Sequence, residues 1–406
     1  STMHGRLREL YAHAKSVKED AIFATYPHCP QFSRPDRDSI MPPVADYMDL
    51  ATSETHEMPR VDDGGRLICN ARHLKQCSAM DVPTFVTSWI KYPGGYRAPE
   101  NAQEVKLSIA ESACYGGHPF PATWANRPWE RDGKTLYLSP ERGPALRQYM
   151  RFFADNEDLY AGSRSLATVG VLYSTPSTAY DRDVAKAHLQ GLEQVLLQHQ
   201  IPFGIVFDEH GLRASEYDLI CVPNQRLLSD EVCDLLRKHL SEGGTLLLTG
   251  EPGRFDEHHR ERERDGLADL YDLEPVTWLE DAPECALDGP DGRVTPLCPY
   301  LPEAHDEVAS AVMRALPEAL PAEVIADEHV GIGVYRTADG AVAVHLLNYA
   351  NSEPTMVNLR VGETLVFRGE VELLTPDEGT RIEAMRDGTW TVEALDTYAA
   401  VLFRAE

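Results

Sequence analysis

The segment LATVGVLYS (Leu166–Ser174) decides the fold of this chain, because it opens a series of short apolar runs separated by amphipathic stretches. A segment with helical periodicity follows over Asp181–Gln200. The later runs are FGIVF (203–207), YDLICVPN (217–224) and GGTLLLTG (243–250), with a second helical segment at Ser229–Leu240. Apolar strands that alternate with helices indicate a parallel sheet covered on both faces. The middle of the chain is therefore predicted to be a doubly wound α/β domain.

The turn after the last of these strands points to a known type of domain. Such a layout resembles the class I glutamine amidotransferases, which carry a reactive Cys in a G-x-C-x-G elbow at this place. Here the turn reads Thr249-Gly250-Glu251-Pro252-Gly253 and has no thiol. Cys221 and Cys233 fall within a strand and on a helix, where a small buried apolar residue is expected. The resemblance thus implies a domain that has kept its structure without the nucleophile, since an active amidotransferase or cysteine peptidase needs a thiol at position 250 or 251.

A nucleophile-free module of this kind resembles the trimerisation domain of bacterial β-galactosidases. The matching segments are VGVLYSTPS with Tyr180 soon after, GLEQVLLQHQIPFGIV, YDLICVPNQRLLSDEVCDLLRKHLSEGGTLLLTGEPGRFDE and the later HLLNYAN. The chain is also similar to α-L-fucosidase-like barrels. The resemblance implies a carbohydrate substrate and a homo-oligomer, a trimer or a dimer.

Composition excludes several classes of function. The 406 residues are too many for one ordinary domain. A formal charge of −27 would repel phosphate and argues against nucleic acid as a partner. No run of eighteen apolar residues is present, so no membrane span is expected, and the first residues lack the apolar core of a signal peptide. A cytoplasmic protein is expected if this N-terminus is the natural one.

The eight cysteines stand singly, without a C-x-x-C pair or Cys/His ligand spacing. This pattern supports neither a disulfide framework nor a structural zinc site. We expect no metal and no cofactor.

Residues 1–160 contain four strand candidates separated by helices or long loops. They are AIFATYP (21–27), DYMDLATSE (46–54), TFVTSWI (84–90) and YGGHPFPATW (115–124). Helices are expected at Leu7–Val17, Leu67–Ala79, Ala102–Ala113 and Arg142–Tyr160. Four βα units in series resemble the C-terminal half of a (β/α)₈ barrel. Closure needs eight strands, so we expect either that the chain is a fragment or that another chain supplies the missing half-barrel.

The C-terminal part of the chain switches to short alternating strands from Val324 onward. This pattern predicts a small antiparallel sandwich or barrel. Before it, Pro275–Pro302 is expected to be an irregular connection, and Asp256–Asp265 a charged surface loop. The predicted domains are a glycosidase-like half (β/α)₈ barrel over 1–160, a flavodoxin- or amidotransferase-like domain over 161–322 and a β-sandwich over 323–406.

In a (β/α)₈ enzyme the active site lies at the carboxyl ends of the strands. Glycoside cleavage needs carboxylates for proton transfer or nucleophilic attack, with aromatic rings that stack on sugars. Glu54 is the first catalytic candidate, because it ends a predicted strand, and Glu57 is the second. The alternative for Glu54 is a loop carboxylate that caps a backbone amide or pairs with Arg60. The expected substrate-binding residues are Tyr26, His28, Asp49, His56, Trp89, Lys91, Tyr92, His118, Trp124 and Trp129.

Purely structural roles are also possible for these candidate binding residues. The Trp and Tyr side chains also suit packing between domains. The spacing of His28, His56 and His118 matches no metal motif, so structural roles are open for them as well. The segment Lys91–Tyr96 contains Gly94-Gly95 and is expected to be a flexible loop or a plain turn.

One departure from the β-galactosidase pattern bears on the activity. Those enzymes carry one catalytic Glu on the fourth strand and a nucleophile Glu at the end of the seventh. The candidate seventh strand here, Thr84–Ile90, has no carboxylate. The α-L-fucosidase-like arrangement, with an Asp nucleophile on the fourth strand and a Glu acid later, suits the sequence better. We therefore expect a glycoside hydrolase-related protein whose second carboxylate lies outside this chain; the alternative is a non-catalytic carbohydrate-binding or assembly protein.

Overall fold

The computed structural model describes residues 2–25, 45–55, 58–80, 82–88, 90–92, 95–97, 99, 101–116, 118–119, 129–131, 134–136, 142–208, 213–274, 276–279, 286–288, 295–297, 302–350, 354–361, 369–385 and 388–404. These residues form two compact units. Of the described residues, the first unit contains those up to Leu166 together with those from Pro321 onward, and the second contains those within Ala167–Leu320.

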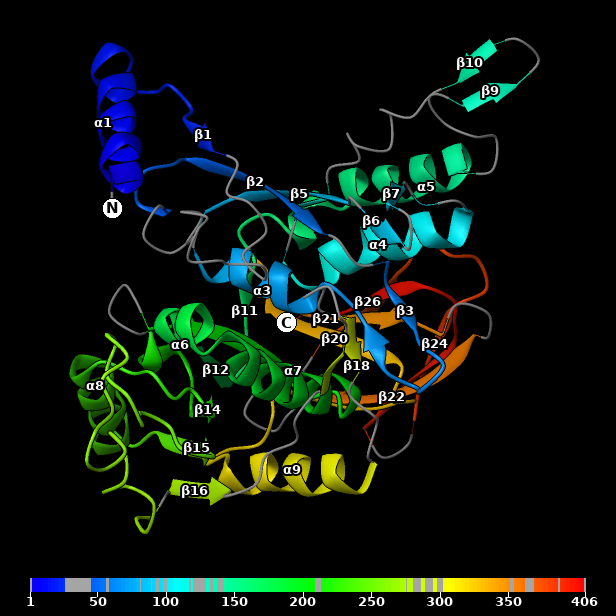
Figure 1. Cartoon of the computed structure of the whole chain (residues 1–406). Helices are drawn as coiled ribbons and strands as arrows, with labels where there is room; N and C mark the ends of the chain where they lie inside the picture. The colour runs from blue at the N-terminus through cyan, green and yellow to red at the C-terminus, as the bar shows by residue number, and fades with distance from the viewer. Residues whose placement is uncertain are drawn as a thin grey trace. The chain divides into compact units, whose positions relative to one another are not determined.

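The second unit is built on a five-stranded parallel sheet (Figure 1). Its strand order is β13 (Phe203–Phe207), β12 (Val169–Tyr173), β14 (Leu219–Pro223), β15 (Thr245–Thr249) and β16 (Val276–Leu279). The helices are α6 (Thr175–Tyr180), α7 (Arg182–Gln198), α8 (Asp230–Ser241) and α9 (Pro302–Ala315). This strand order is that of flavodoxin-like folds. The strands and helices predicted between 166 and 250 are confirmed.

Burial explains why these strands read as continuous apolar runs. Every residue of β12, β14 and β15 is buried, as expected for a parallel sheet with both faces covered. Helix α8 begins at a cap in which the Ser229 hydroxyl accepts from the Val232 amide at 3.2 Å. Its apolar face then packs Val232 and Leu236 against the strand residues Ile220 and Leu246.

The expectation of an irregular connection over Pro275–Pro302 was wrong. The structure places β16, β17 (Ala286–Asp288) and β18 (Thr295–Leu297) in this range. β16 extends the main sheet by pairing in parallel with β15, and β17 pairs with β18 as an antiparallel ribbon. The run Val276–Leu279 is apolar and β-branched at its start, and this local preference outweighs the Pro, Asp and Gly content around it.

The first unit contains a four-stranded parallel sheet. Its order is β1 (Ala24–Thr25), β2 (Leu50–Thr55), β5 (Thr84–Ser88) and β8 (His118–Pro119). The helices are α1 (Thr2–Val17), α3 (Ala71–Ala79), α4 (Ala102–Cys114) and α5 (Arg142–Asp155). Leu7 of α1 packs beside the buried Met48 and Ala51 of the β2 segment. The four predicted strands are thus present and parallel, and β1 and β8 are the short ones.

The C-terminal segment forms two antiparallel sheets that face each other. One sheet has the order β11 (Arg164–Ser165), β20 (Val330–Arg336), β21 (Val342–Asn348), β26 (Tyr398–Phe403) and β23 (Val371–Leu374). The other has the order β19 (Ala322–Ile325), β22 (Thr355–Val361), β25 (Trp390–Leu395) and β24 (Arg381–Ala384). Of the two forms expected for this segment, a sandwich or a barrel, the structure shows the sandwich.

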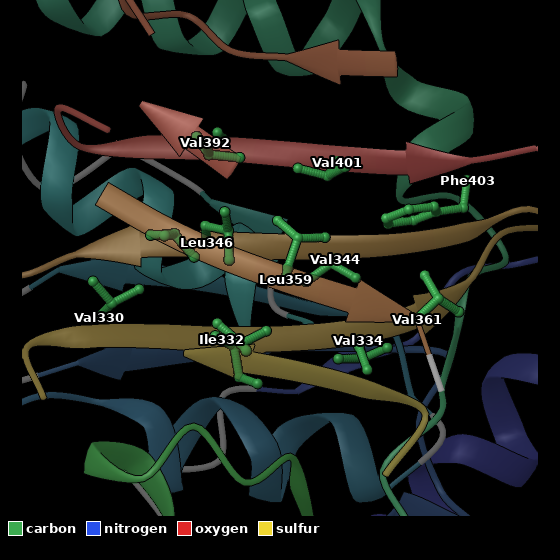
Figure 2. Close-up of a cluster of buried hydrophobic side chains, with 14 of the residues drawn as sticks. Val330, Ile332, Val334, Val344, Leu346, Leu359, Val361, Val392, Val401 and Phe403 are labelled. Carbon is green, nitrogen blue, oxygen red and sulfur yellow. The ribbon is translucent and has the colours of Figure 1, made fainter. Parts of the chain in front are cut away.

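Figure 2 shows the core of this sandwich, with valine and leucine side chains from both sheets meeting in one layer. Ile332 and Val344 come from one sheet, and Leu359 and Val392 from the other. All four are buried.

The helices of the N-terminal segment pack on the same sandwich within the first unit. The buried Glu111 carboxylate of α4 accepts from the Asn70 side chain at 2.7 Å and from the Tyr349 hydroxyl at 2.9 Å. The Lys106 ammonium donates to Asp377 at 2.8 Å. The segments predicted as the first and third domains therefore form one compact unit.

Among the helices of the described ranges, none combines the length and the apolar character that a membrane crossing requires.

Candidate functional site

The carboxyl edge of the four-stranded sheet gathers the ends of four parallel strands. Thr25 of β1 pairs with Ala51, Thr55 of β2 pairs with Ser88, and Val86 of β5 pairs with Pro119. Parallel strands in one sheet end at the same edge, where (β/α)₈ enzymes build their active sites. The predicted residues Tyr26, His28, His56, Glu57, Trp89 and Trp124 come after these strands in the sequence and lie outside the described residues.

Glu54 is the penultimate residue of β2 and pairs with Thr87 of β5. Thr87 lies two residues beyond Phe85 on the same strand. Positions two apart on a strand fall on one face, so positions 54 and 87 fall on the face to which Phe85 belongs. Phe85 is 38% exposed although its strand is internal to the sheet. The face that carries position 54 is therefore open at Phe85, whereas Ala51 on the other face is fully buried.

A β-hairpin follows each of three strands of this sheet before the chain enters its next helix. Strands β3 (Arg60–Val61) and β4 (Leu67–Ile68) follow β2. Strands β6 (Ile90–Tyr92) and β7 (Gly95–Arg97) follow β5, and β9 (Trp129–Arg131) and β10 (Lys134–Leu136) follow β8.

Four of the predicted binding residues are placed by these elements. Lys91 and Tyr92 lie on β6, Trp129 lies on β9 and His118 begins β8. The segment expected to be a flexible loop or a plain turn at Lys91–Tyr96 is instead a β-hairpin, in which Lys91 pairs with Tyr96. The expectation missed the alternation of Ile90, Tyr92 and Tyr96, which favours a strand on either side of Gly94.

The turn of the hairpin after β2 is closed by a half-buried ion pair. The Asp62 carboxylate accepts from the Arg66 Nε at 2.8 Å, from the Arg66 amide at 3.0 Å and from the Gly64 amide at 2.9 Å. Met58 is buried where the chain leaves residue 57, and its Sδ lies 3.8 Å from the Ser108 hydroxyl. Arg60 donates to the Met58 carbonyl at 2.9 Å. The chain is therefore anchored at Met58, where the description resumes before the hairpin.

The position expected for Asp49 needs correction. Asp49 precedes Leu50, the first residue of β2, and so it lies at the amino end of the strand rather than at the carboxyl edge. Its carboxylate pairs with Lys15 at 2.8 Å and accepts from the Phe23 amide at 2.8 Å and the Tyr11 hydroxyl at 3.2 Å. The hydrogen bond from Lys15 lowers the pKa of this carboxyl. The predicted strand began four residues too early, because DYMDLATSE is apolar enough at Tyr47 and Met48 to read as strand throughout.

The turn of the second unit that corresponds to the amidotransferase elbow has no room for a side chain at position 250. Gly250 has φ +62°, the left-handed region that favours glycine. A Cβ added at Gly250 would lie 2.5 Å from Cγ of Asn224 and 2.6 Å from its Oδ1. Asn224 is in turn held by His188, whose Nε2 lies 2.8 Å from its Nδ2, and its Oδ1 accepts from the Glu251 amide at 3.0 Å. The Asn224 amide therefore fills the space that a side chain at position 250 would need, and position 251 carries the exposed Glu251 in place of a thiol.

The switch point of the same sheet, between β12 and β14, is also closed. In open α/β sheets this is the usual ligand crevice. Here the Ser174 amide donates to Gln225 Oε1 at 3.0 Å and the Ser174 hydroxyl donates to the Leu227 carbonyl at 2.7 Å. The Ser177 hydroxyl accepts from the Leu227 amide at 2.8 Å. All four residues are fully buried, so protein groups occupy the crevice.

The two cysteines that the structure describes in the second unit are not reactive thiols. Burial raises the pKa of the Cys221 thiol to about 12 and that of Cys233 to about 11. Burial also raises the pKa of the Asp208 carboxyl to about 6, against hydrogen bonds from the Thr175 amide. The sequence interpretation missed both Asp208 and Asn224; the available signal for Asn224 was an Asn directly after a buried strand, a residue that tolerates the left-handed conformation it adopts here, with φ +44°.

Several solved structures are similar to this chain. No family model matches the chain, and no curated protein matches it either. Alpha-L-fucosidase isoenzyme 2 from Paenibacillus thiaminolyticus is similar with a TM-score of 0.61 and 13% identity, over 99% of this chain and 71% of that one.

Two further solved structures are similar to the same extent. They are the apo exo-carrageenase GH42 from Bacteroides ovatus (TM-score 0.61, 12% identity, 99% of this chain and 55% of that one) and the β-galactosidase from Bacillus circulans sp. alkalophilus (TM-score 0.61, 11% identity, 96% and 64%). The chain thus spans between 55% and 71% of the length of these proteins. It has a mixed α/β fold like that of these glycoside hydrolases.

Proposed function

We propose that this chain contributes the C-terminal half of the catalytic barrel of a glycoside hydrolase, with Glu54 as its catalytic carboxylate. The observation that carries the proposal is the place of Glu54, next to the carboxyl end of a parallel strand and in register with Thr87 of the neighbouring strand. This edge is where (β/α)₈ enzymes build their active sites. The overall likeness to an α-L-fucosidase, an exo-carrageenase and a β-galactosidase supports it.

In the proposed mechanism Glu54 donates a proton to the leaving oxygen of a glycosidic bond and later takes one from water. The partner carboxylate comes from the other half of the barrel, outside this chain segment. A retaining reaction requires the two carboxyl groups about 5–5.5 Å apart, and an inverting one about 6.5–9.5 Å apart. The exposure of Phe85 supports this arrangement, because positions 54 and 85 share one face of the sheet and Phe85 is accessible on that face.

The remaining predicted residues receive supporting roles. Trp89, Tyr92, Trp124 and Trp129 offer rings for the apolar face of a sugar, and His28, His56 and His118 offer hydrogen bonds to its hydroxyls. Lys91 and Tyr92, which lie on β6, are proposed to contact the substrate. Glu57 is the reserve carboxylate. We further propose that the second unit holds a homo-oligomer together.

The test compares two proteins, the wild type purified from its native source and the same protein carrying Glu54→Gln. Any segment that completes the barrel is kept in both. Hydrolysis of a panel of aryl glycosides is measured, and we expect Glu54→Gln to lower kcat by about 10²–10⁴-fold. A general-acid variant keeps more activity on aryl groups that are weak bases, because these need little protonation to leave. The control is Glu9→Gln on the exposed surface of α1, which should change nothing. Full activity in Glu54→Gln would remove Glu54 from the mechanism and move the test to Glu57→Gln.

A second candidate function is a non-catalytic carbohydrate-binding or assembly protein. The observation that favours it concerns Asp49, whose carboxylate binds Lys15, the Tyr11 hydroxyl and the Phe23 amide. One of the carboxylates expected to bind substrate is therefore engaged in contacts within the protein. The intact mass of the native polypeptide separates the two. A mass well above 45.3 kDa favours the hydrolase, because an upstream half-barrel is then part of the same chain.

A further inference from the structure

An aromatic pair lies on the surface of the second unit. Tyr180, the last residue of α6, is 61% exposed. Its ring stacks on the imidazole of His259 with centroids 6.5 Å apart and an interplanar angle of 28°. His259 is itself exposed, and its other contact is the ring of Phe255, edge-on at 5.0 Å. We call Tyr180, His259 and Phe255 the aromatic platform.

A tight turn holds His259 in this place. The Asp256 Oδ1 accepts from the amides of His258 at 3.0 Å and Arg260 at 2.8 Å, and the Asp256 carbonyl accepts from the His259 amide at 3.0 Å. The closed turn gives His259 a φ of +62°. Glycine adopts this conformation without the steric cost that a side chain brings. A costly conformation is therefore used to present a ring to solvent.

Contacts with Arg226 fix Phe255 of the aromatic platform to the rest of the second unit. The guanidinium of Arg226 lies 5.0 Å from the centroid of the Phe255 ring and pairs with Asp181 at 3.0 Å, at the start of α7. The Phe255 amide donates to the Arg226 carbonyl at 2.8 Å. Both rings that face solvent are thus attached to ordered elements at fixed spacing.

The surroundings decide what kind of ligand fits. Within 251–266 the exposed side chains are charged or imidazole, and none is aliphatic: Glu251, His258, His259, Arg260, Glu261, Glu263 and Arg264. Protein interfaces have apolar cores from which charged residues are depleted, so an isolated ring pair inside a charged rim does not suit them. A pyranose does suit it, because one face presents C–H groups to a ring while its hydroxyls hydrogen-bond to charged neighbours.

We propose that the aromatic platform is a second carbohydrate-binding site, which stacks on a pyranose unit of a polysaccharide and works independently of the carboxylates in the first unit. The inference goes beyond the proposed hydrolysis, because it needs neither Glu54 nor a complete barrel. It assigns to Tyr180 the main stacking surface and to His259 the second ring. The strained turn at Asp256–Arg260 sets the angle between them.

The test is native gel electrophoresis of the full chain in gels that contain soluble galactan, carrageenan or dextran. We expect at least one polysaccharide to retard the wild-type chain, and Tyr180→Ala and His259→Gly to weaken that retardation by about 3- to 10-fold, the range of a lost ring contact. Tyr180→Phe keeps the ring and should keep most of the retardation. Leu273→Ala, at another exposed residue of the same unit, is the matched control and should behave as wild type.

A loss of folding is not expected to explain the result for His259→Gly, because glycine readily adopts the positive φ of position 259. The thermal midpoint of His259→Gly should equal or exceed that of the wild type. Retardation that is absent for all three polysaccharides, or equal in wild type, Tyr180→Ala and His259→Gly, would overturn the proposal. Its failure is separable from failure of the hydrolase proposal: Glu54→Gln should leave retardation unchanged, and Tyr180→Ala should leave hydrolysis of small aryl glycosides unchanged.

Discussion

The Nδ1 atom of His345 and the hydroxyl oxygen of Tyr398 lie 2.5 Å apart inside the first unit, and both side chains are fully buried. The Tyr398 hydroxyl lies 2.9 Å from that of Tyr160, which continues the chain of hydrogen bonds toward the α5 segment. The Tyr335 ring packs edge-on against the imidazole at 5.2 Å. The rings that contact His345 are those of Tyr160, Tyr335 and Tyr398, and these side chains carry no negative charge that would stabilise an imidazolium.

This burial predicts acid lability of the sandwich. Burial lowers the pKa of His345 to about 3 in the folded chain, below its value near 6.5 when unfolded. The neutral imidazole therefore contributes stability that is complete above about pH 6.5 and is lost as the pH falls toward 3. Between about pH 7.5 and pH 5 the expected loss is about 2 kcal/mol. Hydrogen exchange of the β21 and β26 amides at the two pH values measures it in this unit alone.

The matched variant for that measurement is His345→Gln, which does not titrate. Its free energy of opening should be lower at neutral pH, since a buried hydrogen bond is changed, but should depend less on pH than the wild type. Equal pH dependence in both chains would show that another group is responsible. His239 of the second unit is the internal comparison, because burial lowers its pKa as well.

A second prediction concerns the carboxylate that joins α4 and α5 to the sandwich. Asp377 accepts from Lys106 at 2.8 Å, from the Tyr149 hydroxyl at 2.6 Å and from the amides of Thr397 and Tyr398 at 3.2 Å. Its side chain is only 1% exposed. Asp377→Ala leaves the half-buried Lys106 with a weaker partner and two buried amides without one, so we expect a loss of about 3–5 kcal/mol in chemical denaturation.

Asp396 supplies the control for this variant. It also pairs with Lys106, at 3.0 Å, but its side chain is 39% exposed. Asp396→Ala should therefore cost less than about 1 kcal/mol. Similar costs for the two variants would contradict the assignment of Asp377 as the joining residue.

A third prediction follows from the filled elbow of the second unit. Gly250→Ala should destabilise by several kcal/mol, because the new methyl group meets the Asn224 amide and the left-handed backbone adds about 1–2 kcal/mol. In an Asn224→Gly background the steric part disappears, so the two substitutions should couple by about 1–3 kcal/mol in a double-mutant cycle. Additive effects in thermal or urea unfolding would mean that Asn224 does not occupy the Cβ position.

A fourth prediction concerns the charged segment at 256–265, which the structure shows to be anchored. The Nη1 atom of Arg262 donates to the carbonyls of Phe255 at 2.6 Å, Leu228 at 2.9 Å and Gly253 at 3.2 Å, and its Nη2 pairs with Asp230 at 2.5 Å. Lysine has no planar fork to reach these acceptors together. Arg262→Lys should therefore make the bonds after Arg260 and Arg264 more sensitive to trypsin. The exposed Arg260→Lys retains a cleavage site and is the control; unchanged proteolysis of Arg262→Lys would contradict the anchoring role.

The sequence predicted the second unit well because its signals are local. Runs such as FGIVF are strands in the structure at the residues expected, since a strand buried on both faces must be apolar throughout. The missed strand β16 also has a local signal, the run Val276–Leu279, but the Pro- and Gly-rich surroundings obscured it. The four parallel strands of the first unit were found for the same reason, with their bounds less accurate.

The candidate site was only partly predictable, because strand ends depend on pairing rather than on pattern. Asp49 reads as part of a strand that leads to Glu54, yet the strand begins one residue later and the carboxylate turns to Lys15 on α1. That salt bridge joins residues 34 positions apart, and no periodicity announces it. The formation of the hairpin at Lys91–Tyr96 similarly depends on the pairing of β6 with β7.

By itself the sequence determined the alternation of buried strands and helices, the absence of a thiol at Gly250 and the switch to antiparallel strands near the C-terminus, because each of these is encoded by neighbouring residues. Only the tertiary structure decided that the Asn224 amide closes the elbow, that Asp377 and Glu111 join the N-terminal helices to the sandwich, and that Tyr180 meets His259 on the surface. Those relationships join residues between 26 and 271 positions apart. They arise when burial, hydrogen-bond satisfaction and backbone strain are settled together in the folded chain.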